Sequence, residues 1–469
     1  MAKLIPIYTW NKGVLEFSKR SDSLSRQPWF QGVLLLACVV VAMLLANLPF
    51  TRHLYHAVLE TRLQISLNSP DGAVNILFPR DLTVEKFIND ILMVVFFFTV
   101  GLEIKREIVC GELSTPRKAV MPVIAALGGV LAPALIYTLV NHGSAAASGW
   151  GIPTATDIAF AVGIMSLLGD KVPVSLKVFL TALAIADDLM AILVVALFYG
   201  RKINFVLLGI ALVLVLAVLL MNKMGEKRPW FFFIPAIAIW ILFYYSGIHA
   251  TMSGVVMAFL IPMGPRYSKS YYMRTREIYH RHIVTLDERP SSSGFPNAPQ
   301  RYVLRKLSQT AKGSIGMSYR LEHALAPWVN FLIMPVFALA NAGVRISDPS
   351  YFNVFGFSPE LGSVSMGIFL GLVLGKPLGI ALASLAAVKT KVAEMPAGAS
   401  WPMLVAVACL GGIGFTMSIF VDTLSFGDQP QQTCTMLRDM GKVAVLLASL
   451  CSGVIGALLV TLNARKKQS

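Results

Sequence analysis

Two adjacent aspartates, Asp187 and Asp188, lie in the middle of an apolar run, Val174 to Tyr199, whose 26 residues are enough to cross a lipid bilayer. A charged carboxylate at the centre of a membrane costs roughly 3 kcal/mol or more. Burial penalises the charged form, so near neutral pH such a carboxylate is expected either to be protonated or to hold a cation. A proton and a metal ion would then compete for the same oxygen atoms.

A hard monovalent cation such as sodium needs several oxygen ligands. Aspartate side chains, the hydroxyl of Thr156 and unwound backbone carbonyls would supply them, with water completing the shell. Neighbouring residues point about 100° apart around a helix, so the two aspartates cannot share one partner. We expect one of them to face a sodium site together with Asp157 and the other to contact Lys376.

The alternative for this second aspartate and Lys376 is an ion pair that only holds the helices together. Three acidic side chains with one lysine near the middle of the membrane leave a surplus of negative charge, which needs a cation or protons. The sequence therefore favours ion binding, with sodium expected at Asp188 and Asp187.

Composition indicates an all-α integral membrane protein. The 469 residues are 56% hydrophobic and only 14% charged, with a mean hydropathy of +0.67. The apolar runs are continuous and lack the alternation of barrel strands, which favours helices. Twelve spans are predicted, at residues 29–48, 86–102, 119–140, 150–168, 174–199, 204–222, 230–246, 248–262, 324–342, 362–388, 401–424 and 441–462.

Lysine and arginine are concentrated in alternate short loops, which places both termini in the cytoplasm. The expected division is a cytoplasmic N-terminal tail (1–28), a transporter domain (29–462) and a cytoplasmic C-terminal tail (463–469). A basic cytoplasmic loop at 263–320 carries eleven basic and three acidic residues. The net charge of +15 thus reflects topology, and no nucleic-acid partner is expected because no binding module accompanies the basic clusters. The five cysteines lack metal-site spacing, and no cofactor is expected.

Two of the predicted spans are interrupted by residues that do not suit a continuous apolar helix. GIPTATDIAF (151–160) contains Pro153 and Asp157, and GGIGFTMSIF (411–420) contains three glycines. Each lies in the middle of a three-span unit, spans 3 to 5 and spans 10 to 12, and their offset of seven spans would make the units inverted copies. Asp157 is suited to neutralise the positive ends of the broken helices and Lys376 the negative ends. A simple N-cap is the alternative role for Asp157.

Seven stretches of this chain resemble the NhaA family of bacterial sodium/proton antiporters, in order and over residues 25 to 460. They are GLEIKRE (101–107), GIPTATDIAF (151–160), ALAIADDLMAI (182–192), GIHATMSGV (247–255), LEHALAPWVNFLIMPVFALANAG (321–343), GKPLGI (375–380) and GGIGFTMSIF (411–420).

The resemblance implies a protein of the bacterial inner membrane with twelve transmembrane helices and inverted repeats. Two crossed, discontinuous helices would be spans 4 and 11. The implied activity is electrogenic exchange of cytoplasmic sodium or lithium for external protons. Asp188 matches the family's central cation ligand, Asp187 its neighbour, and Lys376 the lysine that pairs with the latter. Asp157 and Thr156 match residues at the crossed helices.

The resemblance also implies an external hairpin at 52–80 that is associated with homodimers. Regulation by pH is ascribed in the family to charges that match Glu103, Arg106, Glu322 and His323. These residues are also ordinary helix-end charges. His249 is a further candidate pH sensor, although a histidine at the start of a span more often fills a hydrogen-bonded niche. The long 263–320 loop departs from the family pattern.

Other functions fit the sequence less well. An intramembrane aspartyl protease would need Tyr-Asp and Gly-x-Gly-Asp signatures, which the sequence lacks, so no enzyme is expected. A sodium-coupled symporter would need more polar groups for its solute, and a channel would need a continuous polar stripe. Potassium exchange remains open, because cavity size and oxygen number decide the cation.

Overall fold

The computed structural model describes residues 28–63, 65–68, 75–78, 82–200, 203–287, 298–346, 354–356, 362–427 and 429–466. Contacts within the chain divide it into two compact units. The first contains the chain up to Leu92, Glu107–Tyr199 and the chain from Asn330 onward. The second contains Met93–Arg106 and Gly200–Val329. The expected N-terminal tail, up to residue 27, and residues 467–469 of the C-terminal tail lie outside the described residues.

Nine helices in the described part of the chain are long and apolar enough to cross a membrane. They are α2 (Pro28–Asn47), α4–η1–α5 (Val84–Phe87, Ile88–Leu92, Met93–Cys110), α6 (Pro116–Val140), α8 (Val174–Phe198), α9 (Phe205–Lys223), α10 (Pro229–Ser246), α14–η4–α15 (Met317–Trp328, Val329–Ile333, Met334–Asn341), α16–η6–α17 (Val364–Leu370, Gly371–Gly375, Lys376–Lys389) and α20 (Gln431–Lys466).

Two bent pairs bring the number of possible spans among the described residues to eleven. In the first, the 3₁₀-helix η2 (Ala145–Thr154) is followed by α7 (Ile158–Leu167) at an angle of 43°. In the second, α18 (Trp401–Gly411) is followed by α19 (Phe415–Ser425) at an angle of 47°. Both bends lie in the interrupted segments of the sequence.

The predicted span at 248–262 is a shorter helix than expected. Its helix α11 (Thr251–Leu260) has ten residues, which at 1.5 Å per residue cover about half of a bilayer core. Gly247 ends α10 with a φ of 87°, a left-handed conformation that favours glycine, and separates the two helices.

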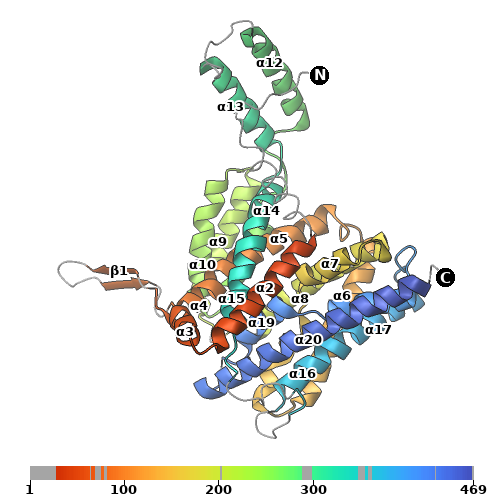
Figure 1. Cartoon of the computed structure of the whole chain (residues 1–469). Helices are drawn as coiled ribbons and strands as arrows, with labels where there is room; N and C mark the ends of the chain where they lie inside the picture. Colours follow the sequence, from red (N-terminus) through yellow and green to blue (C-terminus); the bar gives the residue numbers. More distant parts are fainter. Residues whose placement is uncertain are drawn as a thin grey trace. The chain divides into compact units, whose positions relative to one another are not determined.

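Helix pairs far apart in sequence pack closely within the first unit (Figure 1). Helix α6 packs along α17, α2 along α7, and α20 along both α16 and α18. The approach of α6 to α17 is closest at Gly128 and Gly379, where a Cβ atom on either residue would collide with the carbonyl oxygen of the other. Small residues permit this contact between backbones.

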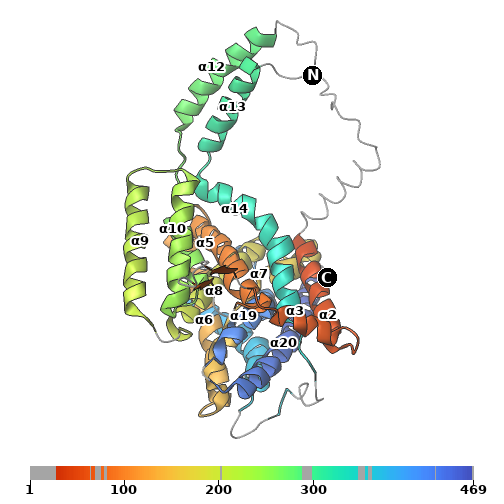
Figure 2. The ribbon, with the colours of Figure 1, turned by 90° about the vertical axis from the view of Figure 1, so that its left-hand side faces the viewer.

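The second unit contains the antiparallel neighbours α9 and α10, which Figure 2 shows side by side. They share an apolar core with α5 and α11 that includes Leu102, Phe232, Ile239 and Met257. The segment expected as a basic loop, 263–320, contains two helices, α12 (Lys269–Asp287) and α13 (Ala298–Gly313), which pack against each other. These helices lie within the predicted loop segment, and Val303 of α13 is buried.

The segment at 52–80 contains the helix α3 (Arg52–Glu60). It continues into two antiparallel strands, β1 (Ile65–Asn68) and β2 (Asn75–Phe78). Ile65 pairs with Phe78, and Asn68 pairs with Asn75. This small hairpin adds two strands to the helices that make up most of the described fold.

A short 3₁₀-helix, η3 (Gly169–Lys171), follows α7.

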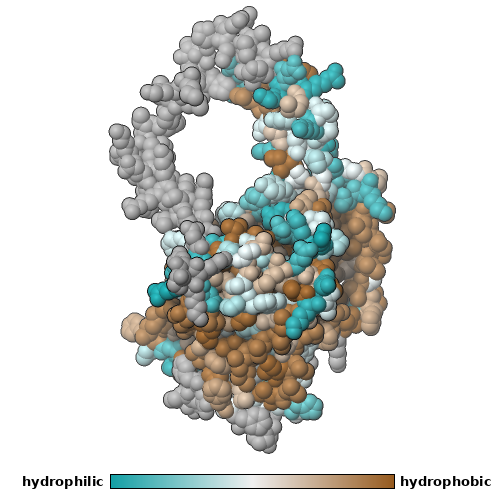
Figure 3. Space-filling view, turned by 90° about the vertical axis from the view of Figure 1, so that its right-hand side faces the viewer, coloured by the Kyte–Doolittle hydropathy of each residue, from teal (hydrophilic) through white to brown (hydrophobic). Residues whose placement is uncertain are grey.

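Large apolar side chains cover much of the outside of these helices. Figure 3 shows a wide hydrophobic surface on one face of the molecule. On α6, Leu131 and Leu139 are 65% and 70% exposed, and on α9 Val206 is 72% exposed. Such a surface suits contact with lipid chains, because water would not solvate it favourably.

We expect Gly379→Val to lower the melting temperature of the detergent-solubilised protein, because the added side chain must push α17 away from α6. The cost should be roughly 1–3 kcal/mol. Gly209→Val on α9 is the matched control, since a Cβ atom at that position meets no described atom within 4 Å. Equal melting temperatures for the two variants would contradict the close packing of α6 and α17.

Candidate ion-binding site

The two bent pairs touch each other at their breaks. The backbone N–H of Asp157 donates to the carbonyl oxygen of Ile413 over 2.7 Å. One carboxylate oxygen of Asp157 accepts from the backbone N–H of Phe160 at 3.3 Å, and the other accepts from the backbone N–H of Thr416 at 3.1 Å and from the Thr416 hydroxyl. Asp157 therefore caps the N-terminal ends of both α7 and α19, where helix dipoles place positive charge.

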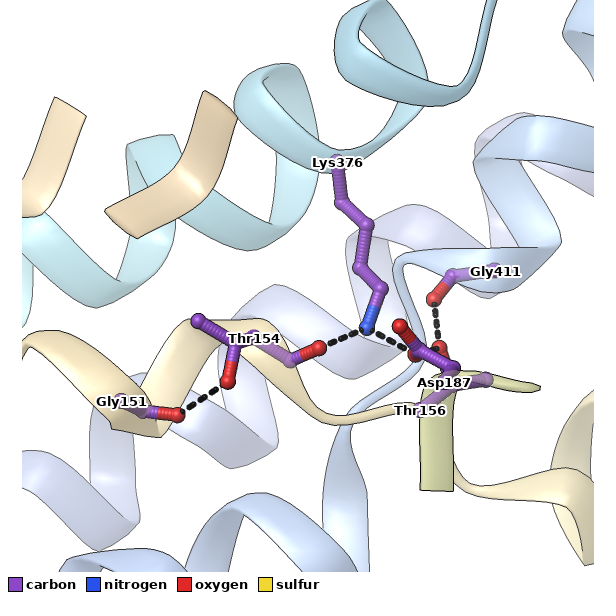
Figure 4. A network of polar contacts seen from close by, with 6 residues as sticks. All are labelled: Gly151, Thr154, Thr156, Asp187, Lys376 and Gly411. Atoms are coloured by element: carbon purple, nitrogen blue, oxygen red, sulfur yellow. Dashed lines mark hydrogen bonds and ion pairs between the residues drawn. The ribbon is translucent and has the colours of Figure 1, made fainter. Parts of the chain in front are cut away.

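Lys376 neutralises a helix end of the opposite sign. Its Nζ atom donates to the carbonyl oxygen of Thr154, at the C-terminal end of η2, over 2.5 Å. It also forms an ion pair with Oδ2 of Asp187 at 2.6 Å (Figure 4). The side chains of Lys376 and Asp187 are 1% and 2% exposed, so water screens this pair very little.

The hydroxyl of Thr156 completes the junction. Its oxygen lies 2.5 Å from Oδ2 of Asp187 and 2.8 Å from the carbonyl oxygen of Gly411, at the end of α18. A hydroxyl has one hydrogen, which can point at only one of these acceptors. A proton on Asp187 or a cation beside the oxygens would satisfy the second contact.

All three aspartates are buried, with Asp157, Asp187 and Asp188 between 1% and 2% exposed. The charge of Asp188 also acts on Lys376. One lysine thus faces more than one carboxylate in a medium of low dielectric, where uncompensated charge is expensive. The junction has the carboxylate, hydroxyl and backbone carbonyl oxygens that unwound transporter helices offer to sodium or protons.

The local sequence explains why the chain unwinds here. Pro153 lacks a backbone N–H and cannot continue a regular helix, and η2 ends directly after it. In the second break, Phe415 adopts a φ of 23°, an uncommon conformation for a residue with a side chain. It is held there because its N–H donates to Ser449 Oγ at 3.1 Å and its ring packs on Phe160, with 4.3 Å between ring centroids.

Comparison with known proteins gives a consistent result. A family model described as Na+/H+ antiporter 1 matches residues 22–460. The chain is 43% identical to a Na(+)/H(+) antiporter NhaA from Acidithiobacillus ferrooxidans, over 93% of this chain and 95% of that protein. Proteins of the same name from Helicobacter pylori strain P12 and Oleidesulfovibrio alaskensis are 41% and 40% identical, and each alignment covers 92% of the relative.

The chain belongs to the Na+/H+ antiporter 1 family. Together with its apolar helices, this membership makes it a multi-pass membrane protein of a bacterial transporter family. The family resemblance inferred from the seven sequence stretches is confirmed.

The candidate pH-regulating residues of this family member lie in the second unit. Arg106 and Glu322 form an ion pair at 2.7 Å, in which the glutamate side chain is 9% exposed. Glu103 lies on the same helix as Arg106, one turn earlier. His323 is exposed, donates from Nδ1 to the carbonyl oxygen of Tyr319 at 3.1 Å, and lies against the Tyr319 ring. It lines a cavity of about 350 Å³ with Pro229 and Arg320.

His249 is separated from this cluster. It follows the C-terminal end of α10, whereas Pro229 at the start of α10 lines the cavity next to His323. The eighteen residues of α10 extend about 27 Å. The five candidate residues therefore do not form one group.

The sequence predicted no individual role for three groups that the structure places at the junction. These are the side chain of Thr416 and the carbonyl groups of Thr154 and Gly411. The threonine of the glycine-rich stretch helped to mark the second break, but its contact with Asp157 was not predicted. The two carbonyl groups are accessible only because the helices stop there, and side-chain identity carries no signal for them.

Lys376→Ala should lower the free energy of unfolding by roughly 3–5 kcal/mol, because it leaves Asp187 buried beside an uncompensated helix end. The double variant Lys376→Ala, Asp187→Asn should recover part of this loss, which thermal melting in detergent would measure. Lys389→Ala, at the exposed end of the same helix, is the control and should melt as the wild type. A double variant no more stable than Lys376→Ala would argue against the ion pair.

Proposed function

We propose that the chain is an electrogenic sodium(lithium)/proton antiporter of the bacterial inner membrane. It would export cytoplasmic sodium in exchange for external protons. The single observation that carries the proposal is the buried junction of Asp157, Asp187, Thr156 and Lys376 at two helix breaks. The relatives' name, Na(+)/H(+) antiporter, supports it.

The proposed mechanism is competition for one set of oxygens. When protons occupy the aspartates, their carboxyl groups are neutral and cannot bind sodium. When Asp188 loses its proton, its carboxylate binds the cation with help from Asp187 and Thr156, while Asp157 and Lys376 keep the helix ends neutral. Because the two ions cannot occupy the site together, sodium moves in one direction and protons in the other. Electrogenic exchange requires that more than one proton enter for each sodium ion exported.

The proposed architecture has twelve spans and two inverted repeats with crossed, discontinuous helices. The bent pairs serve as spans 4 and 11, and α11 would count as the twelfth span despite its length. Both termini would be cytoplasmic. The distribution of lysine and arginine supports this orientation.

A homodimer is proposed through the hairpin of β1 and β2. A two-stranded hairpin is marginally stable by itself in water. Its outer edges carry backbone groups that can pair with the same hairpin of a second copy. The proposed external position of the 52–80 segment leaves these edges accessible.

Regulation by pH is proposed for Glu103, Arg106, Glu322 and His323, and His249 is proposed as a separate pH sensor. The pairing of Arg106 with Glu322 supports this, because a change of charge at a largely buried carboxylate alters the packing of α5 against α14.

Asp188→Asn should abolish exchange, because an amide neither releases a proton nor supplies a charged ligand. Everted vesicles that carry this variant should show no sodium-dependent collapse of a respiration-generated pH gradient. Glu394→Gln, which removes an exposed carboxylate, is the control and should exchange as the wild type. Normal exchange by Asp188→Asn would disprove the assigned site.

Glu322→Gln should shift the pH of half-maximal exchange by about half a unit or more, because it removes the charge that Arg106 faces. Sodium-dependent proton flux in proteoliposomes, recorded from about pH 6 to about pH 9, would measure the shift. An unchanged profile would show that this ion pair has a structural role only.

A further inference from the structure

A buried polar stripe runs along one face of α19, beyond the break. Ser418, Asp422 and Ser425 are spaced i, i+4 and i+7, which aligns them on one side of the helix. They are 0%, 0% and 5% exposed. The stripe covers about 10 Å of helix and starts next to the Asp157–Thr416 contact.

Asp422 is the unusual member of the stripe. Within the described part of the chain, neither of its carboxylate oxygens has a hydrogen-bond partner, and the Ser418 hydroxyl also has none. A fully buried carboxylate without donors is strongly disfavoured as an anion. Space for it is provided by Gly441 on α20, where a Cβ atom would collide with the Asp422 carboxylate.

The charged groups around Asp422 come mainly from α20. Lys442, Arg438 and Asp439 act on it electrostatically, and each is half-buried. Tyr137 and Tyr199 face it from α6 and from the end of α8. The other packed elements, η2 and α15, carry no titratable side chain.

These neighbours decide which ion the carboxylate can take. The cationic side chains of Lys442 and Arg438 repel sodium. Among the described residues, Asp439 is the one other carboxylate whose charge acts on Asp422. Lys442 and Arg438 favour the anion, whereas burial without hydrogen bonds favours the protonated acid. A carboxylate under two opposing influences of this kind is able to gain and lose a proton.

Asp422 is also linked to the ion-binding junction through ordered groups. Ser425 and Asp422 act on Tyr199, whose hydroxyl accepts from the N–H of Gly151 at 3.0 Å. The carbonyl oxygen of Gly151 accepts from the Thr154 hydroxyl at 2.7 Å, and the Thr154 carbonyl oxygen accepts from Lys376. Figure 4 shows the part of this series from Gly151 to Asp187.

We propose that Asp422 is a second proton-binding carboxylate, separate from the Asp187–Asp188 site. The inference rests on the antiport function proposed above. The proposed topology, with both termini cytoplasmic, places α19 in the external half of the membrane. Asp422 binds a proton in the external half of the protein, and its proton occupancy is coupled to the junction through the Tyr199–Gly151–Thr154–Lys376 contacts. External protons would therefore be captured at Asp422 before they displace sodium.

Infrared difference spectroscopy of the full-length protein in lipid, recorded between acidic and alkaline buffer, tests this directly. The carbonyl stretch of protonated carboxylic acids in the wild type should contain a component from Asp422 that disappears as the pH rises. Asp422→Asn should lose that component, whereas Asp188→Asn and Glu394→Gln should keep it. Gly441→Ala, which displaces the carboxylate without removing it, should shift the component and serves where Asp422→Asn fails to fold.

Exchange measured in the same preparations adds a functional readout. Asp422→Asn should keep sodium/proton exchange, with the alkaline limb of its pH profile shifted to lower pH because proton capture then limits the rate. A difference spectrum that is unchanged in Asp422→Asn, or an Asp422 component that does not respond to pH, would overturn the proposal. Absence of sodium-dependent flux in the wild type would instead refute the antiport function and leave the infrared result intact.

Discussion

The structure depends on neutralising four helix ends that meet inside the apolar part of the protein. A helix that stops there leaves N–H and carbonyl groups without partners, and neither lipid nor water supplies them. Asp157 accepts from the two helix starts, Lys376 donates to the end of η2, and Thr156 lies against the carbonyl oxygen at the end of α18. The junction is therefore held by the same polar groups that could bind an ion.

This arrangement explains why Asp187 and Asp188 are suited to different roles although they are adjacent. Oδ2 of Asp187 contacts both Lys376 and the hydroxyl of Thr156. A change in the charge of Asp187 therefore alters the interactions at two helix ends. Asp188 is equally buried and its charge acts on the same lysine, which makes it the better candidate for exchanging cation and proton. An ion bound at Asp188 would therefore act on the helix-end compensation at Asp187, its neighbour in the sequence.

Sequence patterns located much of this site and predicted the contact between Asp187 and Lys376. A proline close to an aspartate, three glycines within four residues and a lone lysine mark the two breaks and Lys376 in otherwise apolar runs. The contacts of Thr156 with Gly411 and of Thr416 with Asp157 were not predictable, because each joins segments more than 250 residues apart. Two details also differ from the hydropathy pattern: α11 is shorter than the predicted span, and the segment predicted as a basic loop, 263–320, contains two helices.

The central claim is that sodium and protons compete for the same buried aspartates. Titration calorimetry of sodium binding to the purified protein, repeated in buffers of different ionisation enthalpy and at several pH values, tests it most directly. Competition predicts that each bound sodium releases protons to the buffer and that the apparent affinity weakens as the pH falls. Sodium binding without proton release, at an affinity independent of pH, would contradict the account.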